Sequence, residues 1–371
     1  MFSLAIFALV GTCFAEQESK SFSEYSWPEL AEMSLLERLK LYPWKLEMIS
    51  VGFIAAYVLT FFIGSKYNDK LVNNFLKGNL DLLKEQFSQV GVTRSKLLAK
   101  DDSEHYAFYA TGRLNIESLT AKFKLQPRQN VFVWFLELVF DFFTGTVAPP
   151  QDVVDLTFQI DSQASSNYDD FIWAIVSKDN MNQLRKDNYF LSLTKTSESN
   201  KLPVEFVFMN EVPEMNEILH HKKFNAVLEK CKAILKFVAV TDQSSEKPET
   251  VSDTTPSKKI VVQLRIPKSS TELEAAHELL KFLLNDYIDY VVSKASFRAE
   301  LTRRCKKTRE AEVSKLKRLE EDLKKEQLAA KKLEDQKKQK AGLNADEQRK
   351  LEKKQLERKQ RRQMGKQKIR Q

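Results

Sequence analysis

The sequence has few of the residues from which enzyme active sites are usually built. Its 371 residues include nine glycines, four histidines and three cysteines, and no glycine-rich phosphate loop of the GxGxxG or GxxxxGK[ST] type occurs. His220 and His221 are adjacent, so they cannot share a helix face, and neither has a cysteine or carboxylate at metal-ligand spacing. We therefore expect no catalytic, cofactor-binding or metal site, and we predict that the protein is not an enzyme.

Long apolar runs are equally scarce, and one at residues 48–64 has the length of a membrane span. This run, MISVGFIAAYVLTFFIG, holds no charged residue. As a helix it would extend roughly 26 Å, at the short end for a hydrocarbon core of about 30 Å and best suited to the thinner endoplasmic reticulum bilayer. We predict a transmembrane helix here. The alternative is a buried helix of a soluble protein.

The first 15 residues predict the direction in which that helix crosses. They read MFSLAIFALVGTCFA, an apolar core ending in small residues, which is typical of a secretory signal cleaved after Ala15. A second spanning helix is the alternative, although the run is short for one. The signal predicts a short luminal segment at residues 16–47 and a cytosolic remainder. Cys13 leaves with the signal, and the two remaining cysteines predict no disulfide.

Residues 65–293 have the composition of a globular cytosolic domain, for which we predict a mixed α+β fold. Alternating apolar positions indicate seven strands, at Tyr106–Leu114, Leu119–Leu125, Val154–Ile160, Phe171–Val176, Val204–Met209, Leu235–Val240 and Ile260–Ile266. Helical spacing occurs at Asp69–Gln89, Asn130–Phe143, Asp179–Asp187, His221–Ile234 and Leu273–Lys294. Thr241–Lys258, rich in Ser, Thr, Pro and Glu, predicts a mobile loop. The pattern leaves the strand order open.

The helix expected at Asn130–Phe143 has two interpretations. Its sequence, NVFVWFLELVFDFF, is almost entirely apolar, but Glu137 and Asp141 are four residues apart and share one face. We favour a buried helix whose acidic face meets solvent. The alternative is a helix that docks onto the bilayer.

The last 78 residues lack proline, and they lack aromatic residues after Phe297. Residues 294–371 hold 28 Lys or Arg against 13 Asp or Glu, a net charge of +15, whereas the whole chain carries +8. Many Glu and Lys residues lie three or four apart, which favours solvated helices. A coiled-coil seam persists for barely two heptads. Gly342 followed by Asn344 and Glu347 indicates a break between two basic helices, of about 45 and about 26 residues.

A charge excess of this density beside a membrane favours a polyanionic partner, either anionic lipid or the phosphates of RNA. Without aromatic residues to stack on bases, contact with RNA would be through its backbone. The abundant RNA at the reticulum surface is ribosomal RNA. The candidate contact residues are Arg303, Arg304, Lys306, Lys307, Arg309, Lys353, Lys354, Arg358, Lys359, Arg361, Arg362, Lys366 and Lys368.

The predicted span also contains a candidate face for a partner helix. Gly52 and Ala56 form a small-xxx-small pair, and Ala55 and Thr60 add small side chains nearby. A partner helix could approach closely there. The alternative is that these residues simply face lipid.

The order of these parts resembles that of the calumin family, the coiled-coil-domain subunits of the PAT complex, an intramembrane chaperone at the translocon of the endoplasmic reticulum. The similarity is carried by the residues around the span, by Tyr109–Arg113, by Phe297–Arg298 and by the basic tail, and it covers nearly the whole chain. Animal members have a long acidic luminal region linked to calcium binding. That region is nearly missing here, so calcium buffering is not carried over from the family.

The resemblance implies a non-enzymatic scaffold of the endoplasmic reticulum membrane. Family members pair with Asterix, a small multi-spanning protein, beside a Sec61-type translocon and under the ribosome, and they serve nascent multi-spanning clients in the lipid bilayer. We therefore expect a single-pass scaffold subunit of a PAT-like chaperone. The alternative function is a membrane tether or shaping protein whose basic tail binds anionic lipid or cytoskeleton.

Overall fold

The computed structural model describes residues 26–42, 44–93, 96–144, 151–341 and 357. The signal peptide predicted at residues 1–15 and the second basic helix predicted after Gly342 lie outside this range. The described chain forms two compact units. One contains the residues up to Asp69 together with those of Pro127–Val147, and the other contains those of Lys70–Gln126 and everything from Ala148 onward.

The described part of the first unit contains helices and their connections but no strand. It consists of α2 (Trp27–Glu32), α3 (Leu35–Leu41), the first part of α4 (Lys45–Gln86) and α5 (Val131–Thr144). Helix α3 starts where the Ser34 backbone N–H donates to Glu37 at 3.0 Å, and it exposes Leu35, Leu36 and Leu39. Helix α4 continues without a break from the apolar run into the second unit, where the sequence had suggested a separate helix from Asp69.

The second unit is built on one antiparallel sheet, in the order β1-β3-β4-β5-β10-β9-β6-β8-β7, with β2 also paired to β3. The fold is therefore α+β, as predicted. All seven predicted strands are present, and the three that were missed are only two or three residues long. The strands are β1 (Gln89–Val90), β2 (Leu98–Lys100), β3 (His105–Arg113), β4 (Ile116–Lys124), β5 (Val153–Ile160), β6 (Trp173–Ser177), β7 (Lys195–Ser197), β8 (Phe206–Asn210), β9 (Leu235–Thr241) and β10 (Lys259–Arg265).

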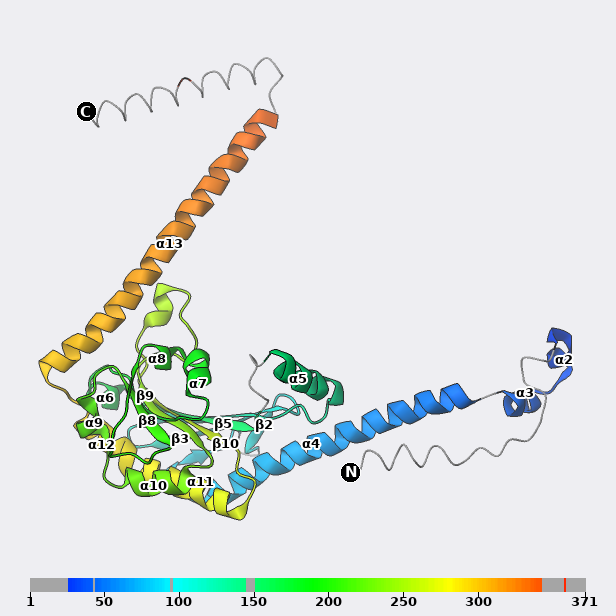
Figure 1. Ribbon diagram of the computed structural model, residues 1–371, viewed down its shortest axis with the longest axis horizontal. Coiled ribbons are helices and arrows are strands. Elements are labelled where there is room, and N and C mark those ends of the chain that lie inside the picture. The colour runs from blue at the N-terminus through cyan, green and yellow to red at the C-terminus, as the bar shows by residue number, and fades with distance from the viewer. Residues whose placement is uncertain (1–25, 43, 94–95, 145–150, 342–356, 358–371) are drawn as a thin grey trace. The chain divides into compact units, whose positions relative to one another are not determined.

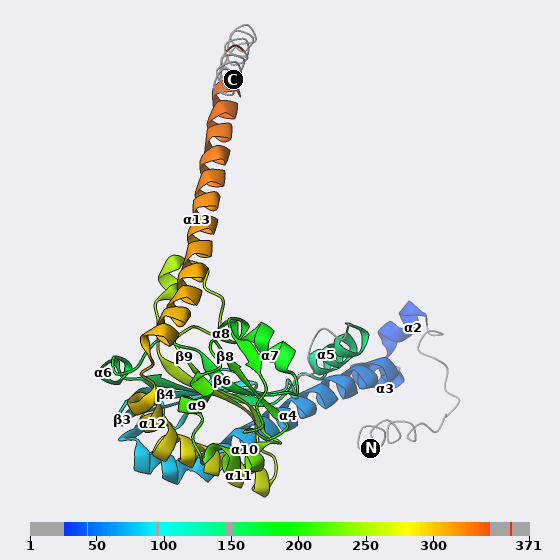
Figure 2. The ribbon, with the colours of Figure 1, turned by 60° about the vertical axis from the view of Figure 1, so that its left-hand side comes forward.

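Helices cover both faces of this sheet (Figures 1 and 2). On one face the end of α4, α10 and α11 close the larger core, and on the other face α7 and α8 close a smaller one. Strand β6 shows why its sequence is a continuous apolar run: Trp173 and Ile175 enter the larger core, whereas Ala174 and Val176 enter the smaller. The helices of this unit are α6 (Ser162–Ser165), α7 (Met181–Asp187), α8 (Tyr189–Ser192), α9 (Met215–Leu219), α10 (Phe224–Cys231), η2 (Val251–Thr254), α11 (Ser270–Phe282), η3 (Leu283–Tyr287), α12 (Ile288–Lys294) and α13 (Ala299–Ala341).

Helix α5 corrects the favoured interpretation of residues 130–143. The helix forms where it was predicted, but it is not buried: Phe135 is 57% exposed, Phe142 84% and Phe143 79%. Apolar density alone cannot distinguish a core helix from one that lies in a membrane, because both environments select the same side chains. The interpretation as a buried helix was therefore wrong.

Candidate functional site

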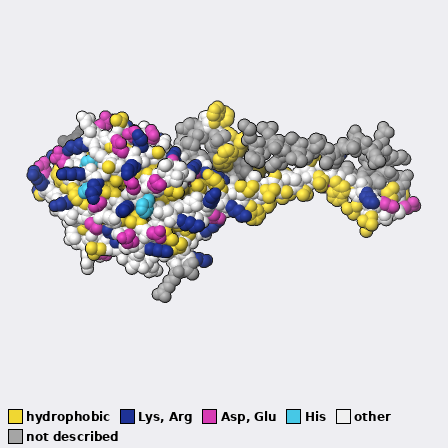
Figure 3. Space-filling model, turned by 90° about the horizontal axis from the view of Figure 1, so that it is seen from below, with side chains coloured by type: hydrophobic (Ala, Val, Ile, Leu, Met, Phe, Trp, Pro, Cys, Tyr) yellow, Lys and Arg dark blue, Asp and Glu magenta, His cyan; other side chains and the backbone are white. Residues whose placement is uncertain are grey.

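The candidate functional residues that the structure describes lie on two helices, the apolar part of α4 and the basic helix α13. Within the described part of the chain, α4 is the one helix long and apolar enough to cross a membrane, and that stretch is not buried against other parts of the protein. Figure 3 shows the hydrophobic side chains along it. A buried soluble helix would be covered by protein, so the exposure of residues such as Ile49, Phe53 and Ile63 disagrees with that alternative.

The structure divides the four small residues of the candidate partner face into two pairs. Gly52 and Ala55 are exposed, and an ideal Cβ built on Gly52 meets no atom within 4 Å. Ala56 and Thr60 are half-buried. Close approach of a second helix is therefore open at Gly52 and Ala55 and is already restricted at Ala56 and Thr60.

Two polar side chains of the span, Ser50 and Thr60, donate hydrogen bonds to its own backbone. The Ser50 hydroxyl donates to the Leu46 carbonyl at 2.9 Å, and the Thr60 hydroxyl donates to the Tyr57 carbonyl at 2.8 Å. Such bonds satisfy the hydroxyl in lipid and leave it no proton to donate to another helix. The span by itself thus has little to offer a polar transmembrane segment.

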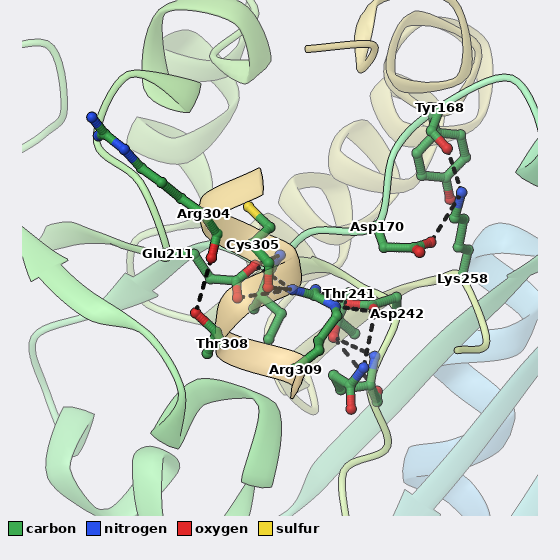
Figure 4. A network of polar contacts seen from close by, with 12 residues as sticks. Tyr168, Asp170, Glu211, Thr241, Asp242, Lys258, Arg304, Cys305, Thr308 and Arg309 are labelled. Carbon is green, nitrogen blue, oxygen red and sulfur yellow. Dashed lines mark hydrogen bonds and ion pairs between the residues drawn. The ribbon is translucent and has the colours of Figure 1, made fainter. Parts of the chain in front are cut away.

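Helix α13 is held to the sheet by Arg309, whose guanidinium lies between two buried carboxylates (Figure 4). Its Nη1 donates to Glu211 Oε1 at 2.9 Å, its Nε donates to Asp242 Oδ2 at 2.7 Å, and its Nη2 also bonds Asp242. The side chains are 15% exposed for Arg309, 3% for Glu211 and 1% for Asp242. Burial raises the pKa of Glu211, while the charge of Arg309 acts in the opposite direction.

This placement corrects the expectation that Arg309 contacts ribosomal RNA. A guanidinium engaged by two buried carboxylates is not free to bind a phosphate. The role of Arg309 in attaching α13 to the sheet could not be predicted from its neighbours in sequence, because its partners Glu211 and Asp242 precede it by 98 and 67 residues.

Three further contacts fasten the first part of α13 to the sheet unit. Thr302 Oγ1 donates to Asp169 at 3.2 Å, Tyr189 Oη donates to Glu312 at 3.2 Å, and the Val251 N–H donates to Glu320 at 3.0 Å. The last contact belongs to the segment predicted as a mobile loop, which therefore packs against α13. Residues 321–332 of α13 are exposed.

The remaining predicted cations of the tail differ in their surroundings. Arg303, Lys306 and Lys307 are exposed. Arg304 is half-exposed and pairs with Glu300 at 2.7 Å and Glu214 at 3.4 Å. Cys305, between Arg304 and Lys306 in the sequence, is buried. Because burial raises the pKa of its thiol to about 12, it is not a reactive nucleophile. The second group of predicted contacts lies outside the described residues: Lys353, Lys354, Arg358, Lys359, Arg361, Arg362, Lys366 and Lys368.

The motif Tyr109–Arg113 has a structural role in the sheet unit. Gly112 has φ +90°, and a Cβ there would overlap the side chain of Ser88, so glycine is required. Arg113 Nη2 lies 2.9 Å from Asp289 Oδ2 and also bonds the Leu284 carbonyl. The motif thus ties the β3–β4 hairpin to the π-helical turn η3 and to α12.

Comparison with known proteins adds a family match to this geometry. Residues 43–362 match the family model described as PAT complex subunit CCDC47. A UPF0674 endoplasmic reticulum membrane protein of Schizosaccharomyces pombe is 29% identical over 269 residues, which cover 71% of this chain and 72% of that protein. One of Saccharomyces cerevisiae is 26% identical over 292 residues, which cover 72% of each chain. The match is to a complex subunit and to membrane proteins, and none of these is an enzyme class.

Proposed function

Because this chain belongs to the family of the PAT complex subunit CCDC47, we propose that it is the scaffold subunit of an intramembrane chaperone of the endoplasmic reticulum. It binds the translocating ribosome and supports the insertion of multi-spanning membrane proteins. The family match over residues 43–362 is the observation that carries the proposal. The relatives named as endoplasmic reticulum membrane proteins support the location in that membrane. In this proposal the short N-terminal segment lies in the lumen and the sheet unit in the cytosol.

The chemistry of the span supports a role as an anchor. A nascent helix with polar side chains needs polar partners inside the bilayer, because unsatisfied groups in hydrocarbon are costly. The hydroxyls of Ser50 and Thr60 are already donated to their own helix. A second, polar-faced membrane protein, such as an Asterix-like subunit, would therefore shelter the client, and the exposed Gly52 and Ala55 offer it a place to pack.

The attachment of α13 supports the ribosome contact. Arg309 and the contacts up to Glu320 hold the base of the helix on the sheet unit, while Arg303, Lys306 and Lys307 remain exposed. Cations fixed on a rigid helix can meet an array of phosphates with little loss of conformational entropy. The same cations could meet anionic lipid, which is the basis of the alternative function as a membrane tether.

Quantitative membrane proteomics of a deletion strain tests the proposal. We expect multi-spanning proteins with charged or polar helices to decrease, while secreted and single-span proteins are largely spared. The small partner subunit should be lost from ribosome–translocon complexes at the same time. If both classes decreased equally, or neither changed, the scaffold function would be wrong.

A matched pair of rescue variants sharpens this test. The full-length chain should restore the clients. Gly52→Leu should insert and fold but retain less of the partner, because the leucine fills the space in which a partner backbone would approach. Ile63→Leu, at another exposed position of the same helix, is the control and should rescue fully.

A further inference from the structure

Helix α5 belongs to a long connection between two neighbouring strands. β4 and β5 are hydrogen-bonded partners, and Lys124 at the end of β4 is paired with Val153 at the start of β5. The chain therefore leaves the sheet at the end of β4 and returns to it beside that point, at the start of β5. A connection with this topology cannot end on the far side of a membrane, so whatever depth it reaches, it must come back.

The outgoing part of this connection follows α4 from the end of the span toward its middle. Arg128 Nη1 donates to Asn68 Oδ1 at 2.9 Å, and the guanidinium lies 5.0 Å from the centre of the Tyr67 ring. At Gly64 an ideal Cβ would lie 2.5 Å from the Arg128 carbonyl carbon, so the two backbones are in close contact there.

Phe132, in the first turn of α5, reaches further along the same helix. Its ring centre lies 6.0 Å from that of Tyr57 and 6.1 Å from that of Phe53. Tyr57 and Phe53 precede Gly64 by 7 and 11 residues, which corresponds to about 10 and 16 Å along a helix. Half of a hydrocarbon core is about 15 Å. Phe132 thus lies at the depth of the middle of the span.

The exposed side chains described on α5 are all apolar. They are Phe132, Val133, Trp134, Phe135, Leu136, Phe140, Phe142 and Phe143. A soluble protein rarely exposes so large a contiguous apolar surface to water, because the surface would drive association. Hydrocarbon imposes no such penalty, and the contact with the middle of α4 places the start of this surface where hydrocarbon would be.

We propose that α5 is a re-entrant membrane helix, which enters the cytosolic leaflet beside α4, faces the lipid acyl chains and returns to the sheet. The proposal rests on the membrane span of the proposed function. The 14 residues of α5 extend about 21 Å, too short to cross about 30 Å of hydrocarbon.

Single cysteines in the full-length protein, in sealed microsomes, test the proposal. Phe135→Cys and Phe142→Cys report on α5, Leu59→Cys on the span and Val204→Cys on the surface of the sheet unit, and all four positions are exposed on the protein. A charged, membrane-impermeant maleimide should label Val204→Cys at least about tenfold faster than the other three, because hydrocarbon excludes charge. Detergent should remove the difference.

The outcomes separate this proposal from the proposed function. Rapid labelling of Leu59→Cys would show that α4 is not in the membrane and would overturn both. Protection of Leu59→Cys together with rapid labelling at Phe135→Cys and Phe142→Cys would overturn only the re-entrant helix.

A second readout separates lipid from a covering protein. A fluorophore attached to Phe135→Cys should be quenched more strongly by lipids that carry a nitroxide on the acyl chain than by headgroup-labelled lipids. Protection from maleimide without quenching by either lipid would mean that a protein covers α5, and the assignment to lipid would be wrong.

Discussion

Arg309 is the residue on which the attachment of the basic helix depends. Its guanidinium pairs with both Glu211 and Asp242, which are almost completely buried. Two carboxylates in such a site are tolerated because they share one well-oriented cation and further hydrogen bonds, such as the one that Glu211 accepts from the Ile172 N–H at 3.0 Å. The network contributes more to the position of α13 than to overall stability, since burying the charges is itself costly.

Replacing Arg309 by methionine should destabilise the sheet unit. The change leaves two buried carboxylates without their cation, and breaking a buried ion pair from one side costs roughly 3–5 kcal/mol. The free energy of unfolding, measured by denaturant titration of the purified protein in detergent, checks this. Arg303→Met, at an exposed position of the same helix, is the matched control and should change it by less than about 0.5 kcal/mol. Equal effects of the two changes would contradict the network.

The loss caused by Arg309→Met should depend on pH. Burial raises the pKa of Glu211 in the folded protein, and Arg309 partly opposes this, so removing the cation raises that pKa further. A carboxyl whose folded pKa lies above its unfolded value stabilises the fold below the unfolded pKa and loses this contribution as pH rises through the folded pKa. The difference between wild type and variant should therefore be largest near pH 7 and diminish toward pH 4. A difference independent of pH would exclude Glu211 as the cause.

For single residues, the sequence predicted which positions are basic but not which of them are buried by the fold. Arg303, Lys306 and Arg309 all belong to one basic run, and composition treats them alike. Only the fold brings Glu211 and Asp242 beneath one of the three. A buried partner that lies far away in sequence leaves no mark in the spacing of a helix, so the distinction could not have been made from the chain alone.

Among the elements, α4 and the segment after β4 depend on a glycine. Gly64 lets the backbone at Arg128 and Gln129 approach α4 more closely than any side chain would permit. The same helix contains Gly52, where nothing lies within 4 Å. The two glycines are thus a natural pair for testing whether the connection is seated on α4.

Gly64→Ala should displace the segment around Arg128, whereas Gly52→Ala should not. Each change adds one methyl group and raises helix propensity by a similar amount, but the methyl group at position 64 would lie 2.5 Å from the Arg128 carbonyl oxygen and 2.6 Å from the Gln129 nitrogen. Trypsin added to microsomes should cleave after Arg128 several times faster in Gly64→Ala than in wild type. Unchanged cleavage, or the same increase in Gly52→Ala, would contradict the close contact.

The elements themselves were largely predictable, but their arrangement was not. Seven strands could be recognised from the pattern of their apolar residues, because each places one or both faces in a core. The strand order was inaccessible, since β10 inserts between β5 and β9 and β6 pairs with β9 as well as with β8. Helix α5 was found but its burial was wrongly predicted, because apolar composition alone does not distinguish a helix buried in a core from one exposed at the protein surface.

For the whole molecule, the most informative feature is the unequal distribution of charge between the tail and the rest of the chain. The tail after residue 293 carries +15 and the rest of the chain −7. An acidic remainder would disfavour binding of the whole surface to a polyanion, so binding should be confined to the tail. The contacts of Arg309, Thr302 and Glu320 fix where the first exposed cations lie on the sheet unit.

Neutralising the exposed cations of α13 should weaken binding to ribosomes and reduce its dependence on salt. Each phosphate contact contributes about 0.7–0.9 to the slope of log K against log salt. Changing Arg303, Arg304, Lys306 and Lys307 to Gln should therefore lower the slope by up to about 3, while membrane insertion stays unchanged. Cosedimentation with ribosomes over a salt series measures this.

The control and the competing outcomes complete this test. Four exposed lysines of the sheet unit, Lys77, Lys84, Lys186 and Lys195, provide a variant with the same loss of charge, which should leave the slope near its wild-type value. Ribonuclease treatment should abolish the salt-dependent binding, because it removes the phosphates.

If the tail variant cosedimented as well as wild type but lost binding to anionic vesicles, the cations would serve a lipid surface, and the tether would replace the ribosome contact as the function of the tail. If neither kind of binding responded to salt, association would depend on protein–protein contacts, and the ribosome contact through the tail would be wrong.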